Sequence, residues 1–598
     1  MKREQIDQRY KWRLEDIIPS DEVWEEEFAK LVKYGDELAA FDGALKDRDS
    51  VLRCLKLDDE ASLCAERIYV FSAMRRDENV GDPAAQKRCD RAETAMVRLS
   101  ERTSFVTPQL IALGEAKLAE FAADPDFKDY DYMLRLLIRT ARHTLSPSEE
   151  KLLAMTGSFA DTAQDAFRML DNADIKFAPY VDSTGEEVKL THGIYGVKMH
   201  SPVREDRKKA FECMHGAFKD NVNTIAALYS GNVKKDLFYS RARKYASCLD
   251  RATSREDVPR TVYDRLVECV EKNIPLLSRY LELRRNRLGL DKLHMYDLHV
   301  PIVEDAELRL EYEDACKLVK QGLAPLGEEY GKLLDRAFTE GWIDVCENEG
   351  KRSGAYSWGA YGTHPYVLLN YQKTTSEIFT IAHELGHAMH SYHSDGAQPY
   401  PKAGYTIFVA EIASTVNETL MLCHLLEKYG GDKAMREYLL SYMLDMFRTT
   451  VFRQTQFAQF ELAAHELAER DEPLSAETFC DLYYDLNRKY YAGEHVVNDE
   501  LIRYEWSRIP HFYTSFYVYK YATGYSTAVA LSEAIRSEGE PAVRRYLEFL
   551  SMGGSAYPLD ELRHAGVDLA TPAPIEAALG KFARLLDDAE ACAAALGR

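Results

Sequence analysis

Apolar residues recur every three or four positions through most of this 598-residue chain, and that spacing predicts amphipathic helices. The pattern dominates residues 20–170, 205–285 and 425–590, where Ala, Leu, Glu, Lys and Arg are frequent. No linker rich in Pro, Gly or Ser, no low-complexity tract and no internal repeat separates these stretches. We therefore expect a mainly α-helical protein whose lobes are fused around one cleft.

Two short stretches before residue 375 have a different pattern. Residues 354–359 and 366–371 are aromatic and aliphatic and are interrupted by glycines, which predicts two strands. An exposed strand edge can bind an extended peptide through main-chain hydrogen bonds, and a purely structural hairpin is the alternative. A second hairpin is expected between Phe177 and Leu190, around the turn at residues 182–185.

A helix is predicted from about residue 375 to 392. Thr374 and Glu377 have the spacing of a capping box at its start. Six apolar residues then follow at helical intervals: Ile378, Ile381, Ala382, Leu385, Met389 and Tyr392. This stripe points nearly opposite to His383, His387 and His390, so one face can enter the core while the histidines face a cleft.

Residues 383–387 read His-Glu-Leu-Gly-His, the pattern that places two imidazoles and a carboxylate at a zinc ion on one helix. His383 and His387 are four positions apart, so both rings project from one face and can share a Zn²⁺. In zinc peptidases the glutamate at the position of Glu384 is a general base, which takes a proton from water that the metal activates. An accidental match in a charged helix is the alternative.

A catalytic zinc usually has three protein ligands, so this pair needs a third. His390 shares the histidine face but lies about 7.5 Å along the axis beyond the midpoint of the pair, so we keep it as a site-lining or substrate-contacting residue. His393 has the spacing of the third metzincin histidine, but His390 occupies the position at which that motif requires glycine.

Glu411 is the remaining option, in the first turn of a second amphipathic helix predicted from residue 408 to 429. The connection over residues 393–406 contains glycines and prolines, so the chain can reverse and bring the two helices together. The sequence therefore predicts a zinc site formed by His383, His387 and Glu411, with one ion per chain.

Two further acidic residues are candidates for contacts behind this site. Ligand histidines commonly donate their second N–H to a carboxylate or a carbonyl. Glu418, two turns beyond Glu411 on roughly the same side, fits this role, and so does Asp395. Solvation is the alternative for either one, and the sequence does not choose between them.

Several motifs together resemble one family, the thimet-oligopeptidase-like zinc peptidases, and most closely its oligoendopeptidase F members. The motifs are His-Glu-Leu-Gly-His-Ala-Met-His at 383–390, Phe-Val-Ala-Glu-Ile-Ala-Ser-Thr at 408–415, the approach at 353–358 and 366–370, the start at 10–19 and a late block at 509–524. They span almost the whole chain. The resemblance implies segments 1–110, 111–200 (oligoendopeptidase N-terminal type) and 201–598 (catalytic).

The fold implied by the resemblance is an elongated, multi-lobed helical zincin fold around a deep channel that admits short unstructured peptides. A small β-sheet beside the active-site helix is part of it, and the family's third ligand matches Glu411. The resemblance also supports peptide binding at the strand edge around Gly354, Ala355 and Tyr356.

The late block supplies candidate donors for the oxyanion that forms when a peptide bond is attacked. His511 is followed by five tyrosines, and the family resemblance implies that a histidine and tyrosines here close on the substrate. We favour His511, Tyr517 and Tyr521, with Tyr519 as a rival that could contact substrate. Tyr517 and Tyr521 are expected on one helix, and ordinary aromatic packing is the alternative for each tyrosine.

Charge, apolar runs and cysteine content limit the classes of partner and the locations expected for this protein. The formal charge is −22 with no concentrated Lys/Arg run, so nucleic acid is not expected as a partner. No stretch of 18 or more apolar residues occurs and the first residues are charged, so we expect no membrane span. The 11 scattered cysteines form no C-x-x-C pair, which favours reduced thiols and a cytoplasmic location.

These features predict a zinc-dependent endopeptidase that hydrolyses internal bonds of short peptides with Glu384 as general base. A carboxypeptidase or dipeptidyl carboxypeptidase on the same fold is the first alternative. A catalytically silent peptide-binding protein is the second, and the intact Glu384 argues against it because a binding protein needs no general base.

Overall fold

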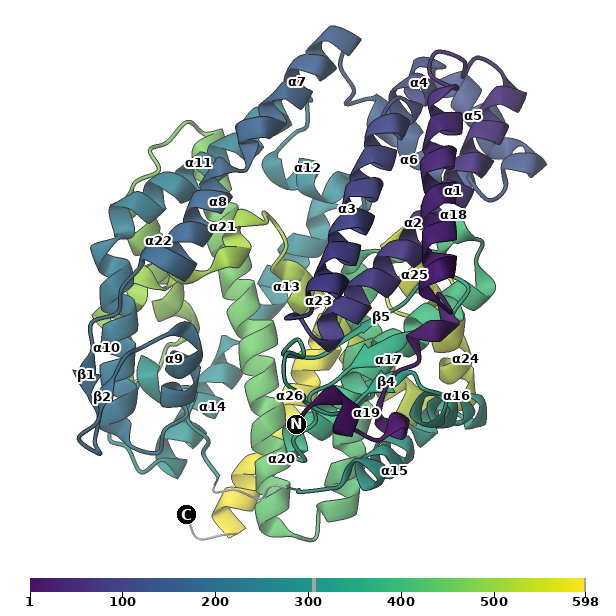
Figure 1. Cartoon of the computed structure of the whole chain (residues 1–598). Coiled ribbons are helices and arrows are strands. Elements are labelled where there is room, and N and C mark those ends of the chain that lie inside the picture. Colours follow the sequence, from purple (N-terminus) through teal and green to yellow (C-terminus); the bar gives the residue numbers. More distant parts are fainter. Residues whose placement is uncertain (304–307, 596–598) are drawn as a thin grey trace. The chain divides into compact units, whose positions relative to one another are not determined.

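The computed structural model (Figure 1) describes residues 1–303 and 308–595. These residues form two compact units. Unit 1 comprises Met1–Arg142, Glu307–His424 and Leu531–Val567, and unit 2 comprises His143–Ala306, Leu425–Ala530 and Asp568–Arg598. Both units are mainly helical, as the sequence predicts. Each is described by itself below.

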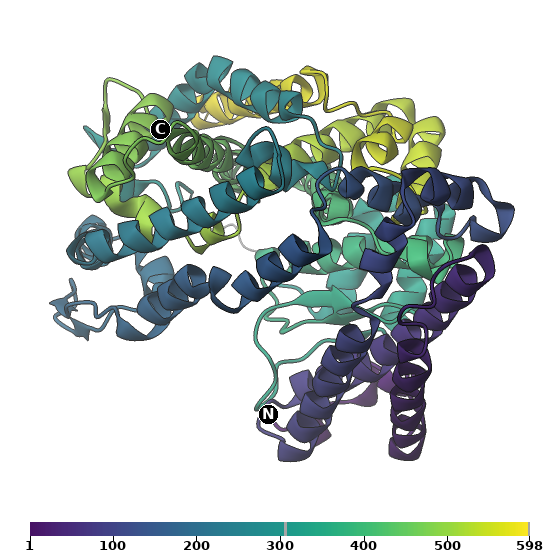
Figure 2. The same cartoon turned by 90° about the horizontal axis from the view of Figure 1, so that it is seen from above.

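The helices of unit 1 come from all three of its segments. They are α1 (Asp21–Ala39), α2 (Arg48–Glu78), α3 (Pro83–Thr103), α4 (Val106–Ala112), α5 (Glu115–Ala123), α6 (Asp131–Ala141), α15 (Tyr312–Gly322), α16 (Glu328–Thr339), α17 (Thr375–Ala397), α18 (Tyr400–Ala403), α19 (Ile407–Tyr429, to His424 in this unit), α24 (Glu540–Leu550) and α25 (Pro558–His564). Helices α1, α2 and α3 pack side by side, as two directions of view show (Figure 1, Figure 2). Trp12, Trp24 and Tyr366 share one buried cluster, which joins these helices to the sheet.

A three-stranded sheet lies against α17, with strand order β4–β6–β5. The strands are β4 (Ile343–Asp344), β5 (Tyr356–Trp358) and β6 (Tyr366–Leu368). β6 is fully buried, runs parallel to β4 and is antiparallel to β5. The two predicted strands are therefore confirmed as β5 and β6. The sequence did not predict β4, because its two residues are too few to show a period.

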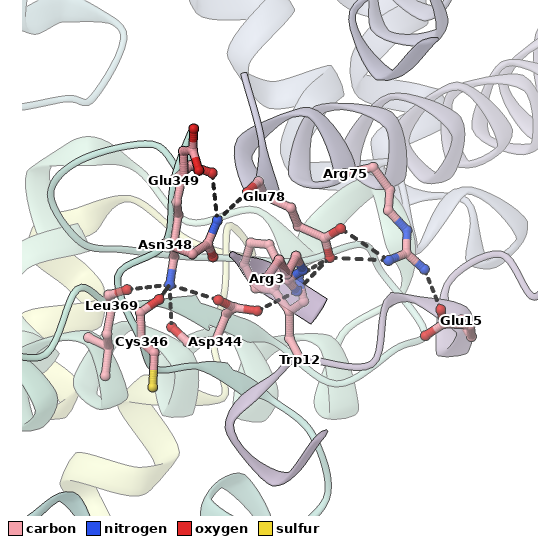
Figure 3. Close-up of polar contacts among 11 residues, drawn as sticks. Arg3, Trp12, Glu15, Arg75, Glu78, Asp344, Cys346, Asn348, Glu349 and Leu369 are labelled. Atoms are coloured by element: carbon pink, nitrogen blue, oxygen red, sulfur yellow. Dashed lines mark hydrogen bonds and ion pairs between the residues drawn. The ribbon is translucent and has the colours of Figure 1, made fainter. Parts of the chain in front are cut away.

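The first residues of the chain are tied to α2 and β4 by buried polar contacts (Figure 3). The Arg3 guanidinium donates to Glu78, at the end of α2, over 2.9 Å and to Asp344, in β4, over 2.6 Å. The Trp12 indole N–H also donates to Glu78, over 2.7 Å. The Asn348 amide donates to the Glu78 carbonyl oxygen over 3.1 Å. The N-terminal segment thus fixes the β4 side of the sheet.

Unit 2 contains two more small sheets. β1 (Tyr180–Val181) and β2 (Glu187–Val188) form the antiparallel hairpin predicted over 177–190, and β3 (Leu293–His294) runs parallel to β7 (Val496–Val497). Its helices are α7 (Pro147–Ala160), α8 (Thr162–Met169), α9 (His192–Met199), α10 (Arg204–Asp220), α11 (Val222–Ala242), α12 (Cys248–Ser254), α13 (Arg260–Lys272), α14 (Ile274–Arg287), α20 (Lys433–Met446), α21 (Arg453–Glu469), α22 (Ala476–Tyr490), α23 (Tyr519–Glu538, to Ala530 in this unit) and α26 (Ala573–Ala595).

Short 3-10 segments of unit 2 connect several of these helices. They include η9 (Glu500–Arg508) and η10 (Pro510–Tyr513), which precede α23. Helix α11 packs on α21 and also contacts η10. Across residues 1–303 and 308–595, no helix combines the length and apolar content that crossing a membrane requires.

Candidate metal centre

Helix α17 carries the predicted histidine pair on a capped, half-buried scaffold. The Thr374 hydroxyl accepts the Glu377 backbone N–H over 3.3 Å, which is the N-cap half of the predicted capping box. The apolar stripe is buried, with Ile378 and Leu385 at 0% exposure. The helix continues to Ala397 rather than ending near 392, because the exposed Gly396 does not break it.

Gly386 allows α19 to cross close to α17. A Cβ on Gly386 would lie 2.5 Å from Ser414 Cα and 2.6 Å from the Ala413 carbonyl oxygen, so only glycine fits this crossing. The Asn417 side-chain amide, on α19, donates a hydrogen bond to the Ala382 carbonyl oxygen, on α17, over 2.9 Å and so links the two helices. Gly386 was not among the functional residues predicted from the sequence, although a glycine inside a predicted helix is a known signal of close packing.

The close crossing brings His383, His387 and Glu411 together in unit 1. Their potential ligand atoms all lie within 4.8 Å of one another. The two Nε2 atoms are 3.2 Å apart, and Glu411 Oε2 is 3.5 Å from His383 Nε2 and 3.4 Å from His387 Nε2. In a tetrahedral zinc site with bonds of about 2.0–2.1 Å, ligand atoms are about 3.3 Å apart. The three side chains therefore fit a zinc ion.

Carboxylates around the histidines favour a cation. Burial alone would lower the pKa of His383, but its hydrogen bond to Glu418 and the charges of Glu418, Glu384 and Glu411 raise that pKa to about 9. A hydrogen bond with His387 lowers the pKa of Glu411 to about 2, against the opposing effect of burial. The Ser414 hydroxyl also donates to Glu411 Oε2 over 3.1 Å. A metal ion can replace the proton that these carboxylates hold on the imidazole.

Of the two acidic residues predicted behind the site, Glu418 and Asp395, Glu418 is the one that contacts a histidine ligand. Its Oε1 accepts a hydrogen bond from His383 Nδ1 over 3.1 Å, so the other ring nitrogen, Nε2, can offer its lone pair when a metal replaces the proton there. Asp395 lies in a different environment, where burial raises its pKa to about 7. The choice that the sequence left open between these residues therefore falls on Glu418.

Glu384 lies beside the metal group and is only 7% exposed. Burial raises the pKa of this carboxyl group, and the charges of His383 and His387 oppose that shift. A carboxylate with a raised pKa accepts a proton more readily than an ordinary one, which suits a general base.

The other two histidines of α17 are not members of the metal group. His390 is 1% exposed, and its ring stacks on Tyr405 with centroids 3.7 Å apart. Burial lowers the pKa of His390 to about 3. Burial also lowers the pKa of His393. The expected site-lining role of His390 is not supported, because a ring packed under Tyr405 has almost no surface for a substrate to touch.

The residues just before β5 form a turn that a hydrogen bond fixes, and they are not part of the regular strand. Gly354 has a φ of 85°, and its carbonyl oxygen accepts the Asn370 amide over 2.8 Å. The Tyr356 hydroxyl donates to Asp77 over 3.0 Å, and Ala355 lies between these two anchored residues. β5 pairs with β6, and within the described residues no strand pairs with its other edge.

His511, Tyr517 and Tyr521 lie together in unit 2. The Tyr521 hydroxyl is 3.4 Å from His511 Nε2, and the Tyr517 ring centroid is 6.2 Å from that of His511 and 5.2 Å from that of Tyr521. Burial lowers the pKa of His511, so its imidazole is neutral near pH 7. The segment thus presents an imidazole and two phenols side by side.

Two expectations for the late block need correction. Helix α23 begins at Tyr519, so Tyr517 precedes the helix instead of lying on it with Tyr521. Tyr519 is 0% exposed and packs on Tyr263 with ring centroids 5.0 Å apart. A fully buried ring cannot contact a substrate directly, so Tyr517 and Tyr521 are the better candidates.

Comparison with known proteins shows which family the chain matches. The model of "Peptidase family M3" matches residues 197–581, and that of "Oligopeptidase F" matches residues 109–177. The chain is 43% identical to oligopeptidase PepF of Bacillus subtilis, over 97% of this chain and 86% of that protein. It is 38% identical to group B oligopeptidase PepB of Streptococcus agalactiae, over 98% of each chain.

Solved structures agree with the sequence relatives. A protein of Chlamydophila abortus matches with a TM-score of 0.92 at 33% identity, over 99% of both chains. Oligoendopeptidase F of Enterococcus faecium matches with a TM-score of 0.74 at 33% identity, over 96% of this chain and 99% of that one. The chain therefore belongs to peptidase family M3 and is a metallopeptidase of the oligoendopeptidase F type.

Proposed function

We propose that this protein is a zinc-dependent endopeptidase that hydrolyses internal bonds of short, unstructured peptides. The observation that carries the proposal is the spacing of 3.2, 3.4 and 3.5 Å among the ligand atoms of His383, His387 and Glu411. Two imidazoles and one carboxylate are a common donor set of catalytic zinc. When bound, Zn²⁺ supplies Lewis acidity, which polarises a carbonyl group and makes water more acidic.

Glu384 is the proposed general base. Its place in the helix, next to His383 and one turn from His387, puts its carboxylate beside the metal group but outside the ligand set. It takes a proton from the attacking water and then delivers that proton to the leaving amine. Glu418 holds the ring of His383 in the tautomer that offers Nε2 to the metal.

His511 and Tyr517 are the proposed donors to the developing oxyanion, with Tyr521 beside them. Support comes from their clustering and from the lowered pKa of His511, because a neutral imidazole and a phenol donate without adding a permanent charge. All three residues belong to unit 2.

Peptide binding is proposed at the edge of β5 that faces away from β6 and that no strand of the described residues occupies. Main-chain hydrogen bonds at a strand edge bind an extended chain with little dependence on its side chains, which suits short peptides of varied sequence. The relatives named as oligopeptidases agree with such substrates. All 11 cysteines are free thiols, which supports a reducing compartment such as the cytoplasm.

A peptide mixture tests the proposal. Peptides with free and with amidated C-termini are incubated with the zinc-loaded protein, with and without a chelator, and the products are identified by mass spectrometry. Internal cuts in amidated peptides that disappear with the chelator are expected. Products from free C-termini alone would indicate a carboxypeptidase, and peptide binding without any product would indicate a binding protein.

A further inference from the structure

The segment that carries His511 and Tyr517 has a backbone conformation that its own sequence does not favour. Phe516 has a φ of 58°, in the left-handed region, which glycine adopts easily and a phenylalanine rarely does. Such a conformation persists only where surrounding contacts impose it. The contacts that hold this segment therefore decide where its side chains point.

Glu461, on α21, provides the contact at Phe516. Its Oε1 accepts the Phe516 backbone N–H over 2.7 Å, and the side chain is 0% exposed. His465, one turn further along α21, packs its ring on Phe516 with centroids 4.6 Å apart. A single buried carboxyl group thus fixes the peptide unit that enters Phe516, one residue before Tyr517.

Two residues of α11 hold the rest of the segment. The Ser515 hydroxyl donates to Asp236 Oδ2, which also lies 3.4 Å from His465 Nε2. The Asn232 amide donates to the Phe512 carbonyl oxygen and to Ser515 Oγ, each over 3.3 Å. Both side chains are buried, at 7% exposure for Asp236 and 1% for Asn232.

We propose that Glu461 and Asp236 are positioning residues of the peptidase reaction, because they clamp the segment from 512 to 516 and so place His511 and Tyr517. Glu461 binds the Phe516 N–H directly before Tyr517, and Asp236 binds the Ser515 hydroxyl. Asn232, beside Asp236 on α11, binds the carbonyl oxygen of Phe512, the residue after His511. A displacement of about 1 Å in a catalytic group can lower a rate about 100-fold. This inference rests on the proposed oxyanion role of His511 and Tyr517.

The carboxyl group of Glu461 offers a conservative test. Burial raises the pKa of Glu461 to about 8, against the opposing charge of His465, so the group is mostly a neutral acid near pH 7. Glutamine has the same shape as that acid and keeps the Oε1 acceptor for Phe516. Glu461→Gln should therefore preserve the clamp, and Glu461→Leu should release it at similar side-chain volume.

The experiment compares Glu461→Gln, Glu461→Leu and Asp236→Ala in the full-length, zinc-loaded protein. Glu437→Leu is the matched control, because Glu437 is also a buried carboxyl group of unit 2, at 6% exposure, but pairs with Arg287 over 2.6 Å. The readouts are kcat and KM on an internally quenched peptide, and hydrogen exchange of the peptide that covers residues 509–519. Thermal midpoints show that each variant is folded.

For Glu461→Leu and Asp236→Ala we expect kcat to fall about 10- to 100-fold with KM little changed, and exchange over 509–519 to rise. Glu461→Gln and Glu437→Leu should resemble wild type in both readouts. Unchanged exchange in Glu461→Leu would overturn the clamp, and so would an equal loss of kcat in Glu437→Leu.

The activity of His511→Ala distinguishes failure of the clamp from failure of the proposed oxyanion role. If exchange rises in Glu461→Leu but His511→Ala keeps its kcat, the clamp stands and the oxyanion role of the segment fails. If His511→Ala loses kcat and Glu461→Leu shows neither change, the oxyanion role stands and the positioning role fails.

Discussion

The metal group and the His511 segment reach their shapes by different routes. His383, Glu384 and His387 share one helix, and a single close crossing at Gly386 adds Glu411. The His511 segment instead depends on residues far away in the sequence, with 280 positions between Asn232 and Phe512 and 55 between Glu461 and Phe516. Local helix geometry and one helix crossing therefore place the metal ligands, and long-range buried polar contacts fix the proposed oxyanion donors.

Gly386→Ala should give the largest loss of bound zinc. The new Cβ would push Ser414, and Ser414 holds Glu411, so the third ligand moves away from the histidines. We expect zinc to be lost, activity to fall on the order of 100-fold or more, and stability to fall by about 3 kcal/mol. Zinc analysis, peptide turnover and thermal unfolding measure these changes.

Gly396→Ala is the matched control in the same helix. Nothing lies within 4 Å of the position of its Cβ, so alanine fits there. It should keep the zinc and add up to about 1 kcal/mol of stability. Retention of zinc and full activity in Gly386→Ala would show that the close crossing does not place Glu411.

His511→Ala and Tyr517→Phe come next, on the other side of the comparison. Each removes one proposed donor to the oxyanion, and loss of one such donor typically lowers kcat about 100-fold or more. Zinc content should stay at the wild-type value, because these residues are outside the metal group. Tyr519→Phe, at a fully buried ring, should leave kcat near wild type, and a loss equal to that of Tyr517→Phe would reverse the assignment.

Glu418→Ala should affect metal binding more than the chemical step. Loss of the hydrogen bond to His383 Nδ1 frees the ring to turn, and such losses typically weaken metal affinity about 10- to 100-fold. Competition with a chelator of known affinity measures the change. Asp395→Asn should bind zinc as wild type does, and an equal weakening there would reopen the choice between the two acids.

Arg3→Ala should have the smallest effect, confined to the stability of unit 1. The change leaves Asp344, with its side chain 1% exposed, without one of its cationic partners, so we expect a loss of about 2 kcal/mol in the free energy of unfolding. Zinc content and kcat at 25 °C should not change. Arg9→Ala, whose side chain is 65% exposed, is the control and should change stability by less than about 0.5 kcal/mol. A loss of zinc in Arg3→Ala would mean that the N-terminal segment supports the site directly.

The sequence predicted the parts of the molecule that local rules determine. Thr374 and the apolar stripe located α17, and the glycines and prolines over 393–406 made Glu411 the plausible third ligand. The hairpin near residue 182 and the strands β5 and β6 followed from the same kind of signal.

The parts that could not be predicted depend on tertiary contacts. The choice of Glu418 over Asp395 needs the position of α19 relative to α17 within unit 1. The left-handed conformation of Phe516 has no local signal, because Glu461 and His465 impose it from another helix. Tyr519 and Tyr517 look alike in the sequence, and only the start of α23 separates the buried ring from the accessible one.

The most direct test of the account is the zinc content and turnover of Glu384→Gln, measured on the same sample. Glu384 is not one of the proposed ligands, so the variant should bind one zinc ion per chain with wild-type affinity. Without its general base it should lose turnover of an amidated peptide by about 1,000-fold or more. A zinc-loaded Glu384→Gln protein that cleaves the peptide at a near-normal rate would contradict the proposed mechanism.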